Sequence, residues 1–315
     1  MKSPIATPLS REAKLERETQ VFAGKNNQRT RSLAWNAIPY FQQKLRERMN
    51  MTAEVNALLD GRTERRALTL ACGDMKGEYG FFKSIGVTSI DAFDLSPGQR
   101  KRCFDLVYDG KIPLDYKIAD VNEAGLEEGA YDIVYMQQSL HHIEAVEKVV
   151  ARIHKALRPD GLFVLIDYVG EPFLQRGPKQ RAVCQRIWSC LPERLRVSQD
   201  GTVRDTIWIP DKKTLSPFEA VRAPAILPAI RQHFETHFEM VFGGVVFPIV
   251  NNFAPHWDPA LEGDETVLKL LWELDEMMTA SGMVEPTFVR AIYRPGAAPD
   301  RNRSWRWRRG ASSKP

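Results

Sequence analysis

The residues from 68 to 78, LTLACGDMKGE, are the first stretch of the chain whose types and spacing suit ligand chemistry. An apolar run ends there in a turn that contains Gly73, and a helical pattern follows. Glycine lets the backbone bend sharply and approach a ligand closely, and the first turn of a helix offers free N–H donors. We therefore expect a ligand where this turn meets the helix.

The same turn does not match the loops that bind pyrophosphates. In the G-x-G-x-x-G pattern of nicotinamide-binding folds, the second and third glycines would fall on Met75 and Glu78. A glutamate aimed at a pyrophosphate repels it, and no G-K-[ST] sequence follows that would make a P-loop. Glu78 instead suits a ligand with a positive group, such as an amino acid's ammonium or a sulfonium.

Two acidic residues end the next two expected strands. Asp94 follows the loop by about twenty residues, a distance at which an acid commonly binds ribose hydroxyls. Asp120 ends the third strand, where a carboxylate can accept a hydrogen bond from an adenine amino group. The alternative is that both acids only cap strand ends. Together with the loop, they favour a nucleoside joined to a cationic amino acid over a dinucleotide.

These residues require a scaffold that brings several strand ends together. Apolar strands are expected at residues 66–72, 89–96, 114–121, 131–137, 162–169, 236–246 and 287–295, with helical patterns between them. Because the first five runs are continuously apolar, the fold class is α/β, with a doubly wound, mostly parallel seven-stranded sheet. Ligands of such sheets bind beyond the carboxyl ends of the strands.

The chain is expected to divide into five regions. They are an N-terminal helical segment at 1–62, a cofactor-binding Rossmann-like core at 63–170, a helical cap inserted after strand five at 171–236, a return to the sheet at 237–295, and a basic tail at 296–315. The cap is assigned to the stretch where strand patterns lapse. Within it, Ser216 and Glu219 have the spacing of a capping box, with Pro217 at the first helical position.

Composition and charge predict a folded body with a basic tail. The 315 residues suffice for one large domain, or one domain with a cap. Residues 301–315 hold six Lys and Arg and no acid, whereas the rest of the chain has 38 basic and 40 acidic residues. The tail, with Trp305 and Trp307, could touch nucleic acid or an anionic membrane, but a solvated, disordered terminus is the simpler interpretation. A nucleic-acid partner is therefore disfavoured.

The expected cellular location follows from the absence of secretion and membrane-spanning signals in the sequence. The N-terminal residues show no basic start followed by an apolar core, so secretion is not expected. No apolar stretch approaches the roughly 20 residues of a membrane helix. The cysteines at positions 72, 103, 184 and 190 show no metal-ligand pairing and no C-x-x-C. They are typical of reduced thiols in a cytoplasmic protein, and no metal site is expected. A homo-oligomer is left open.

Five segments carry a resemblance to a known family: LTLACGD, DAFDLS, KIADVN, YDIVYMQQSLHH, and a helix followed by LRPDGLFVLIDY. Each is weak alone, but the five occur in the family's order and at its spacing. From about residue 66 to residue 168 the chain resembles the class I S-adenosylmethionine-dependent methyltransferases, close to the broad bacterial type 11 group. It departs from their D-x-G-x-G-x-G pattern at Thr69, Ala71 and Met75.

The resemblance implies S-adenosyl-L-methionine as cofactor and S-adenosyl-L-homocysteine as product. It implies that Ala71, Gly73 and Glu78 contact the methionine part of the cofactor, and that Asp94 with Leu95 contacts the ribose. Asp120 and Val121 would flank the adenine, and Gln137 would lie beside the sulfonium. Methyl transfer from a sulfonium is an in-line displacement, in which an enzyme mainly supplies orientation and a dry pocket.

An alcohol acceptor also needs a base suited to neutral pH. Candidates are His142, which follows strand four, and Glu171, which begins the cap and could instead be an ordinary first-turn acid. Of the neighbouring His141 and His142, at least one is expected to be structural. Residues expected on the acceptor side are Tyr168, Trp208, His256 and Trp257.

The sequence therefore predicts a methyltransferase that acts on a hydroxyl of a small molecule or glycan. C- or N-methylation of another metabolite, for example a prenyl or aromatic compound, is the first alternative. A nucleic-acid methyltransferase is less favoured, since MQQS stands where a base-flipping Asn-Pro-Pro-Tyr motif would follow strand four. The remaining alternative is a non-catalytic partner protein that binds the cofactor.

Overall fold

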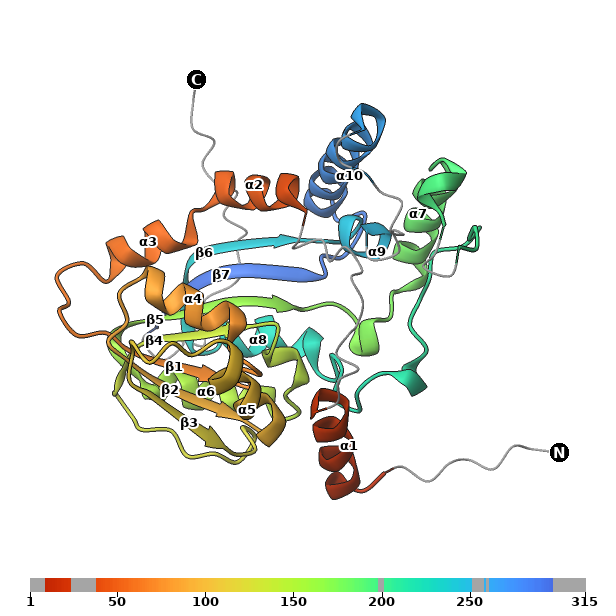
Figure 1. Cartoon of the computed structure of the whole chain (residues 1–315). Coiled ribbons are helices and arrows are strands. Elements are labelled where there is room, and N and C mark those ends of the chain that lie inside the picture. The colour runs from red at the N-terminus through yellow and green to blue at the C-terminus, as the bar shows by residue number, and fades with distance from the viewer. Residues whose placement is uncertain (1–8, 24–37, 198–200, 251–257, 259–260, 297–315) are drawn as a thin grey trace.

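A single seven-stranded sheet organises the chain in the computed structural model, which describes residues 9–23, 38–197, 201–250, 258 and 261–296 (Figure 1). The strands are β1 (Arg66–Leu70), β2 (Ser89–Asp94), β3 (Leu114–Ile118), β4 (Tyr131–Gln137), β5 (Leu157–Tyr168), β6 (Phe234–Phe242) and β7 (Phe288–Pro295). Their order in the sheet is β3-β2-β1-β4-β5-β7-β6, and only β7 runs antiparallel to its neighbours. The predicted fold class is confirmed.

The strand order reverses direction between β1 and β4. From β1 the chain winds outward through β2 to β3, and it then returns to β4 on the other side of β1. The crevice above the carboxyl ends of these two central strands is the usual ligand site of doubly wound sheets. The loop after β1 and the start of η3 (Leu140–His142), a 3₁₀ turn that follows β4, therefore flank the same space.

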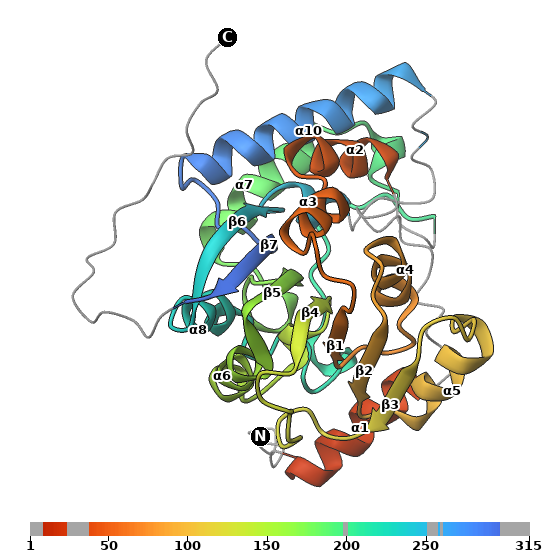
Figure 2. The same ribbon diagram turned by 90° about the vertical axis from the view of Figure 1, so that its left-hand side faces the viewer.

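Helices cover both faces of the sheet. They are α1 (Arg11–Ala23), α2 (Pro39–Arg48), α3 (Met51–Leu58), α4 (Lys76–Ser84), α5 (Pro97–Leu106), α6 (Val146–Ala156), α7 (Pro178–Ser189), α8 (Ile226–Ile230), α9 (Val246–Val250) and α10 (Glu262–Ala280). Figure 2 shows α3 and α4 on one face of the sheet and α6 and α8 on the other. Apolar side chains at helical spacing bury one side of α6, at Val146, Val149, Val150, Ile153 and Ala156.

A new helix of the N-terminal segment begins at Pro39. Pro39 opens α2, where its missing N–H removes no helical hydrogen bond. The helix α1 lies apart from α2 and α3, beyond the carboxyl ends of the strands (Figure 1). It packs against α5 rather than against the other N-terminal helices. None of the described helices is long and apolar enough to span a membrane.

The cap differs from its sequence pattern around residue 216. Instead of a capping box, the Ser216 hydroxyl donates to Glu18 and accepts from the Phe218 N–H, and the side chain of Glu219 points to His141. The expected long helix shrinks to a 3₁₀ turn, η7 (Ala223–Ala225), and the five-residue α8. Repeated prolines in APAILPAI explain this, because each lacks the N–H that a helix interior needs.

The late strands also differ slightly in extent from the expected ones. β6 begins at Phe234 and ends at Phe242, earlier than the 236–246 run, and the residues after it turn into α9. The buried carboxylate of Asp275 on α10 fixes this turn by accepting the N–H groups of Gly243, Val245 and Val246. All four cysteines are free thiols.

Candidate functional site

A cavity of about 450 Å³ opens above the carboxyl ends of β1, β2, β3 and β4. All eight residues that the sequence predicted for cofactor binding line it: Ala71, Gly73, Glu78, Asp94, Leu95, Asp120, Val121 and Gln137. His142, one of the two base candidates, lines it as well. The fold thus brings these nine predicted residues, which are spread over 72 positions of the chain, to the wall of one cavity.

The loop after β1 keeps a left-handed backbone where the chain lacks the family's glycines. The φ angles are 51° at Ala71, 54° at Gly73 and 58° at Met75. Left-handed conformation costs roughly 1–2 kcal/mol for a residue with a side chain. Ala71 and Met75 therefore hold a conformation that glycine adopts without this cost, and Met75, which is fully buried, adds core contacts in return.

Asp94 joins this loop to the next strand end. One carboxylate oxygen accepts the Gly73 N–H at 2.9 Å and the other accepts the Ser96 N–H at 2.8 Å. Burial raises the pKa of Asp94, although these two hydrogen bonds oppose the effect. Each carboxylate oxygen has a second lone pair, so Asp94 can still accept from ribose hydroxyls.

Asp120 lines the cavity with its carboxylate already engaged. Oδ1 accepts the backbone N–H and the side-chain amide of Asn122, both at 2.9 Å, and Oδ2 pairs with Arg11 of α1. Partial burial raises the pKa of Asp120, but the Asn122 hydrogen bonds and Arg11 outweigh it, so the net pKa is lowered. Asp120 is therefore ionised at neutral pH.

Glu78 lies in the first turn of α4 and is only 5% exposed. Its pKa is raised to about 8, first because burial disfavours the charge and then because Asp74 and Asp94 lie nearby, against the lowering effect of backbone hydrogen bonds. A carboxyl group in this condition gains most from a cationic ligand, which would restore its charge.

Gly77 allows the predicted sulfonium contact to be made. A Cβ at Gly77 would lie 2.4 Å from Oε1 of Gln137, so this glycine gives the Gln137 side chain its space across the cavity. Gln137 is held there by the Tyr135 hydroxyl, which donates to the same oxygen at 2.8 Å. No sequence pattern marks Gly77 as a site residue, because the family's glycine pattern ends at position 75.

The wall formed by α1 is the largest feature that sequence reasoning missed. Leu15, Glu18, Thr19 and Phe22 of α1 line the cavity. The helix is held from both sides, since the Gln99 amide donates to the Phe22 carbonyl at 2.7 Å and Arg17 donates to two carbonyls near residue 214 of the cap. A charged helix far upstream carries no sequence signal that it packs on a cofactor loop.

Two adjacent histidines follow β4 and take different positions. His141 is buried, and its Nδ1 donates to Asp167 at 2.5 Å, while Nε2 lies 3.6 Å from Oε1 of Glu219. Burial lowers the pKa of His141, but the two carboxylates outweigh burial and raise it to about 10. His142 lies against the cavity, with Nδ1 3.2 Å from Oε1 of Glu18.

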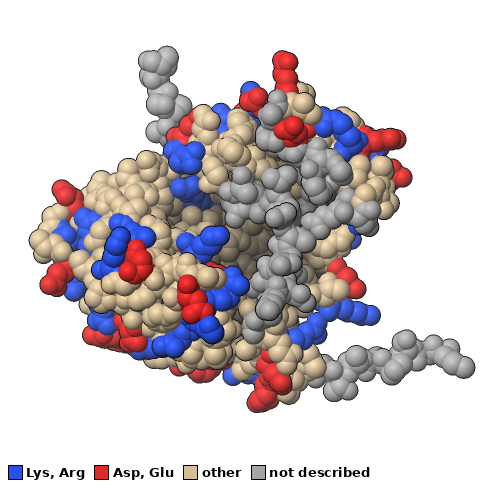
Figure 3. Space-filling view, viewed as in Figure 1, with Lys and Arg blue, Asp and Glu red and all other residues tan. Residues whose placement is uncertain are grey.

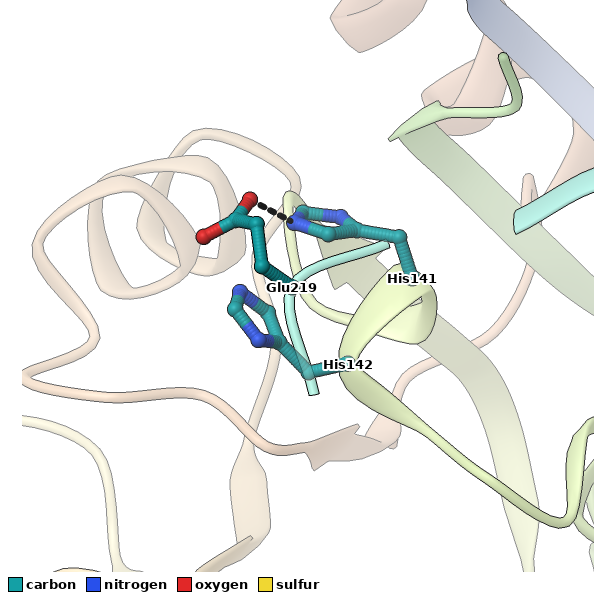
Figure 4. Close-up of side chains that lie close together, drawn as sticks. All are labelled: His141, His142 and Glu219. Atoms are coloured by element: carbon teal, nitrogen blue, oxygen red, sulfur yellow. Dashed lines mark ion pairs between the residues drawn. The ribbon is translucent and has the colours of Figure 1, made fainter. Parts of the chain in front are cut away.

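Those histidines and Glu219 are also the described residues that could hold a metal. Each offers one ligand atom, and the three atoms lie within 4.8 Å of one another (Figure 4). The sequence predicted no metal site, because Glu219 lies 77 residues after His142 and no spacing pattern links them.

Of the other predicted residues, the described ones, Glu171, Tyr168 and Trp208, lie outside the cavity lining. The Glu171 side chain is exposed. Tyr168 is buried, and its hydroxyl donates to the backbone carbonyl of Glu171 at 3.0 Å. Trp208 is 46% exposed on the cap, and His256 and Trp257 fall outside the described residues.

Comparison with known proteins finds a related domain in the centre of the chain. Residues 68–165 match the family described as a methyltransferase domain. A phosphoethanolamine N-methyltransferase from Arabidopsis thaliana is 22% identical over 124 residues, which cover 39% of this chain and 25% of that protein. A hybrid PKS-NRPS synthetase from Hapsidospora irregularis is 30% identical over 128 residues, 39% of this chain and 3% of that protein.

Solved structures are similar at lower identity. An S-adenosylmethionine-dependent methyltransferase from Mesorhizobium loti is 18% identical, with a TM-score of 0.42 over 77% of this chain and 96% of that one. A Haemonchus contortus phosphoethanolamine N-methyltransferase, in complex with its phosphorylated substrate and S-adenosylhomocysteine, is 16% identical, with a TM-score of 0.49 over 94% of this chain and 62% of that one. The chain thus spans a quarter or less of its curated relatives.

The first prediction concerns Asp94. Asp94→Ala removes the ribose acceptor and both backbone hydrogen bonds, so the affinity for S-adenosylhomocysteine should fall about 100-fold, and the free energy of unfolding by about 1–3 kcal/mol. Calorimetry and urea unfolding measure the two effects. Asp105→Ala, on the exposed side of α5, is the control. Normal affinity in the Asp94 variant would refute the assignment of this pocket.

The second prediction concerns pH and Glu78. Because the native pKa is about 8, above the ordinary 4.5, the native state holds this proton more tightly than the unfolded chain. Its contribution to stability is therefore lost as pH rises from about 4.5 to about 8.

A ligand ammonium needs Glu78 ionised, so S-adenosylhomocysteine affinity should rise up to about tenfold per pH unit between about pH 6 and 7.5, with proton release. Calorimetry in buffers of different ionisation enthalpy measures both quantities. In Glu78→Gln the affinity should be weaker and nearly independent of pH. A flat profile in the unaltered protein would contradict the role of Glu78.

Proposed function

We propose that this protein, whose residues 68–165 form a class I S-adenosylmethionine-dependent methyltransferase domain, transfers the cofactor's methyl group to a hydroxyl of a small molecule or glycan. The observation that carries the proposal is the cavity above β1 and β4, with its full set of expected cofactor contacts and His142 on its wall. Cofactor and acceptor would then meet beside Gln137.

The shape and charge of the cavity support the cofactor. Glu78 at one end suits the ammonium of the methionine part, Asp94 suits the ribose, and Asp120 with Val121 suits adenine. The cavity therefore offers one polar side chain for each part of an adenosine joined to an amino acid. The wall supplied by α1 limits access of water, which favours charge dispersal in the transition state.

A hydroxyl acceptor is favoured by the surroundings of His142. Its ring borders the cavity, contacts Phe22 edge-on with centroids 5.4 Å apart, and lies beside the Glu18 carboxylate. A carboxylate next to an imidazole favours the protonated ring that forms when the ring helps to remove a proton. We assign activation of the acceptor hydroxyl to His142, and not to the exposed Glu171.

An amine acceptor is the second candidate, and the named activity of the Arabidopsis thaliana relative favours it. A neutral amine carries its own lone pair, so His142 would then shape the pocket without activating the nucleophile. Transfer to carbon would need the same pocket with an electron-rich ring or alkene. The dependence of rate on His142 separates a hydroxyl acceptor from an amine.

Nucleic acid is a poorer fit as acceptor. Figure 3 shows Lys and Arg interspersed with Asp and Glu on the face it displays, without a continuous basic field. Phosphate backbones are bound through such fields, with strong salt dependence. We infer a small or saccharide acceptor instead.

The test of the proposal is methyl transfer from labelled S-adenosylmethionine to panels of sugars, phenols, alcohols and amines, followed by mass spectrometry of the products. With the best acceptor, His142→Ala should lower kcat about 10²–10⁴-fold. Glu171→Gln should leave kcat within about twofold, because an exposed carboxylate outside the cavity stabilises nothing in the transition state. Equal effects of the two substitutions would overturn the assignment of His142.

Binding of S-adenosylhomocysteine by both variants is the control that separates chemistry from folding. If neither the unaltered protein nor the variants methylate any compound of the panels, yet all of them bind the cofactor, the chain is a cofactor-binding partner protein. That outcome would replace the proposed function.

A further inference from the structure

His141, His142 and Glu219 form a cluster beside the cofactor cavity that the proposed function does not fully use. The two histidines come from η3, directly after β4, and Glu219 comes from the cap turn that follows Ser216. Figure 4 shows both rings and the Glu219 carboxylate facing one small space. The neighbouring Phe218 and His142 itself line the cavity, so this space borders the region where an acceptor would lie.

We propose that this cluster binds one divalent transition-metal ion, such as Zn²⁺, Co²⁺ or Mn²⁺, through Nε2 of His141, Nε2 of His142 and a carboxylate oxygen of Glu219. The three ligand atoms lie within 4.8 Å of one another, and the pair His141 Nε2 and Glu219 Oε1 is 3.6 Å apart. Bonds of about 2.0–2.2 Å require ligand atoms roughly 3–3.5 Å apart, so side-chain shifts of about an ångström complete the site.

A carboxylate stands behind each ring, as it does behind most metal-binding histidines. Nδ1 of His141 donates to Asp167, which in turn accepts the backbone N–H groups of Ser139 and Leu140. Nδ1 of His142 lies 3.2 Å from Glu18, but it forms no hydrogen bond among the described residues. Both rings can therefore keep a proton on Nδ1 and present Nε2 to an ion, which would take the place of the proton between Nε2 of His141 and Glu219.

The donor set selects the class of ion. Two imidazoles and one carboxylate suit Zn²⁺, Co²⁺, Mn²⁺ or Fe²⁺, whereas Mg²⁺ and Ca²⁺ prefer sites built of oxygen ligands alone. Three protein ligands leave at least one coordination position open, which is the pattern of catalytic rather than structural metal sites. A dication also offsets the negative charge of Glu18, Asp167 and Glu219, which surround the two rings.

The open position gives the ion a role that rests on the proposed function. A hydroxyl bound to the ion loses its proton to water more readily, because the cation stabilises the alkoxide. The oxygen then forms its bond to the methyl carbon as the carbon–sulfur bond breaks, and the electron pair of that bond stays on sulfur, which becomes a neutral thioether. With the ion bound, this route would replace direct proton removal by the His142 ring, which would act as a ligand of the ion instead; without the ion, the ring would take the proton as described above.

The test uses the full chain without a histidine tag, stripped with chelator and then titrated with Co²⁺ and Zn²⁺. Calorimetry should give one site per chain, and Co²⁺ should develop the visible absorption of an ion with nitrogen and oxygen ligands. His142→Ala and Glu219→Gln should each weaken binding by about 100-fold or more. Circular dichroism and S-adenosylhomocysteine affinity report whether these variants are folded.

His237→Ala is the matched control, because it removes an exposed histidine that also pairs with a carboxylate, Glu54, at 2.6 Å. It should bind the metal like the unaltered chain. No binding by the unaltered chain, or binding that survives both cluster substitutions, would overturn the proposal. If the metal-free protein transfers methyl groups at the full rate, the proposed function stands and the ion has no role in catalysis. Loss of cofactor binding in the unaltered chain would instead refute the proposed function.

Discussion

The carboxylate of Asp94 is the constraint on which the cavity depends. Its two oxygens accept the N–H groups of Gly73 and Ser96, so one side chain fixes the loop after β1 and the start of α5 together. The loop is left-handed at Ala71 and Met75, where residues with side chains resist that conformation. Charge-assisted hydrogen bonds from the end of β2 help to offset the strain and give the loop one conformation.

The helix α1 adds a wall to the crevice above the strand ends. It connects elements that are distant in the chain, through Arg11 to Asp120, Gln99 to the Phe22 carbonyl, and Ser216 to Glu18. Because Glu18 also lies beside His142, docking of α1 both covers the cofactor region and sets the charge next to the ring. A single helix therefore contributes both a wall and a charge to the cavity.

The cap contributes chemistry as well as cover. Its prolines shorten the helix after residue 222, and the separate turn before it, with Ala220 in left-handed conformation, points the Glu219 carboxylate toward the end of β4. His141 lies between this carboxylate and Asp167 of β5, so the sheet and the cap meet through one buried imidazole. An ordinary capping box would have placed Glu219 on its own helix instead.

The sequence by itself determined the sheet, its strand order class and a set of loop and strand-end residues that line one cavity, since continuous apolar strands and acids at strand ends are local patterns that a doubly wound sheet brings to one edge. Only the tertiary structure decided which of the two adjacent histidines borders the cavity, that α1 forms its wall, and that Glu219 joins the histidines. Those contacts link residues 77 to 198 positions apart. No periodicity records such pairings, because they depend on how loops and helices pack after the sheet has formed.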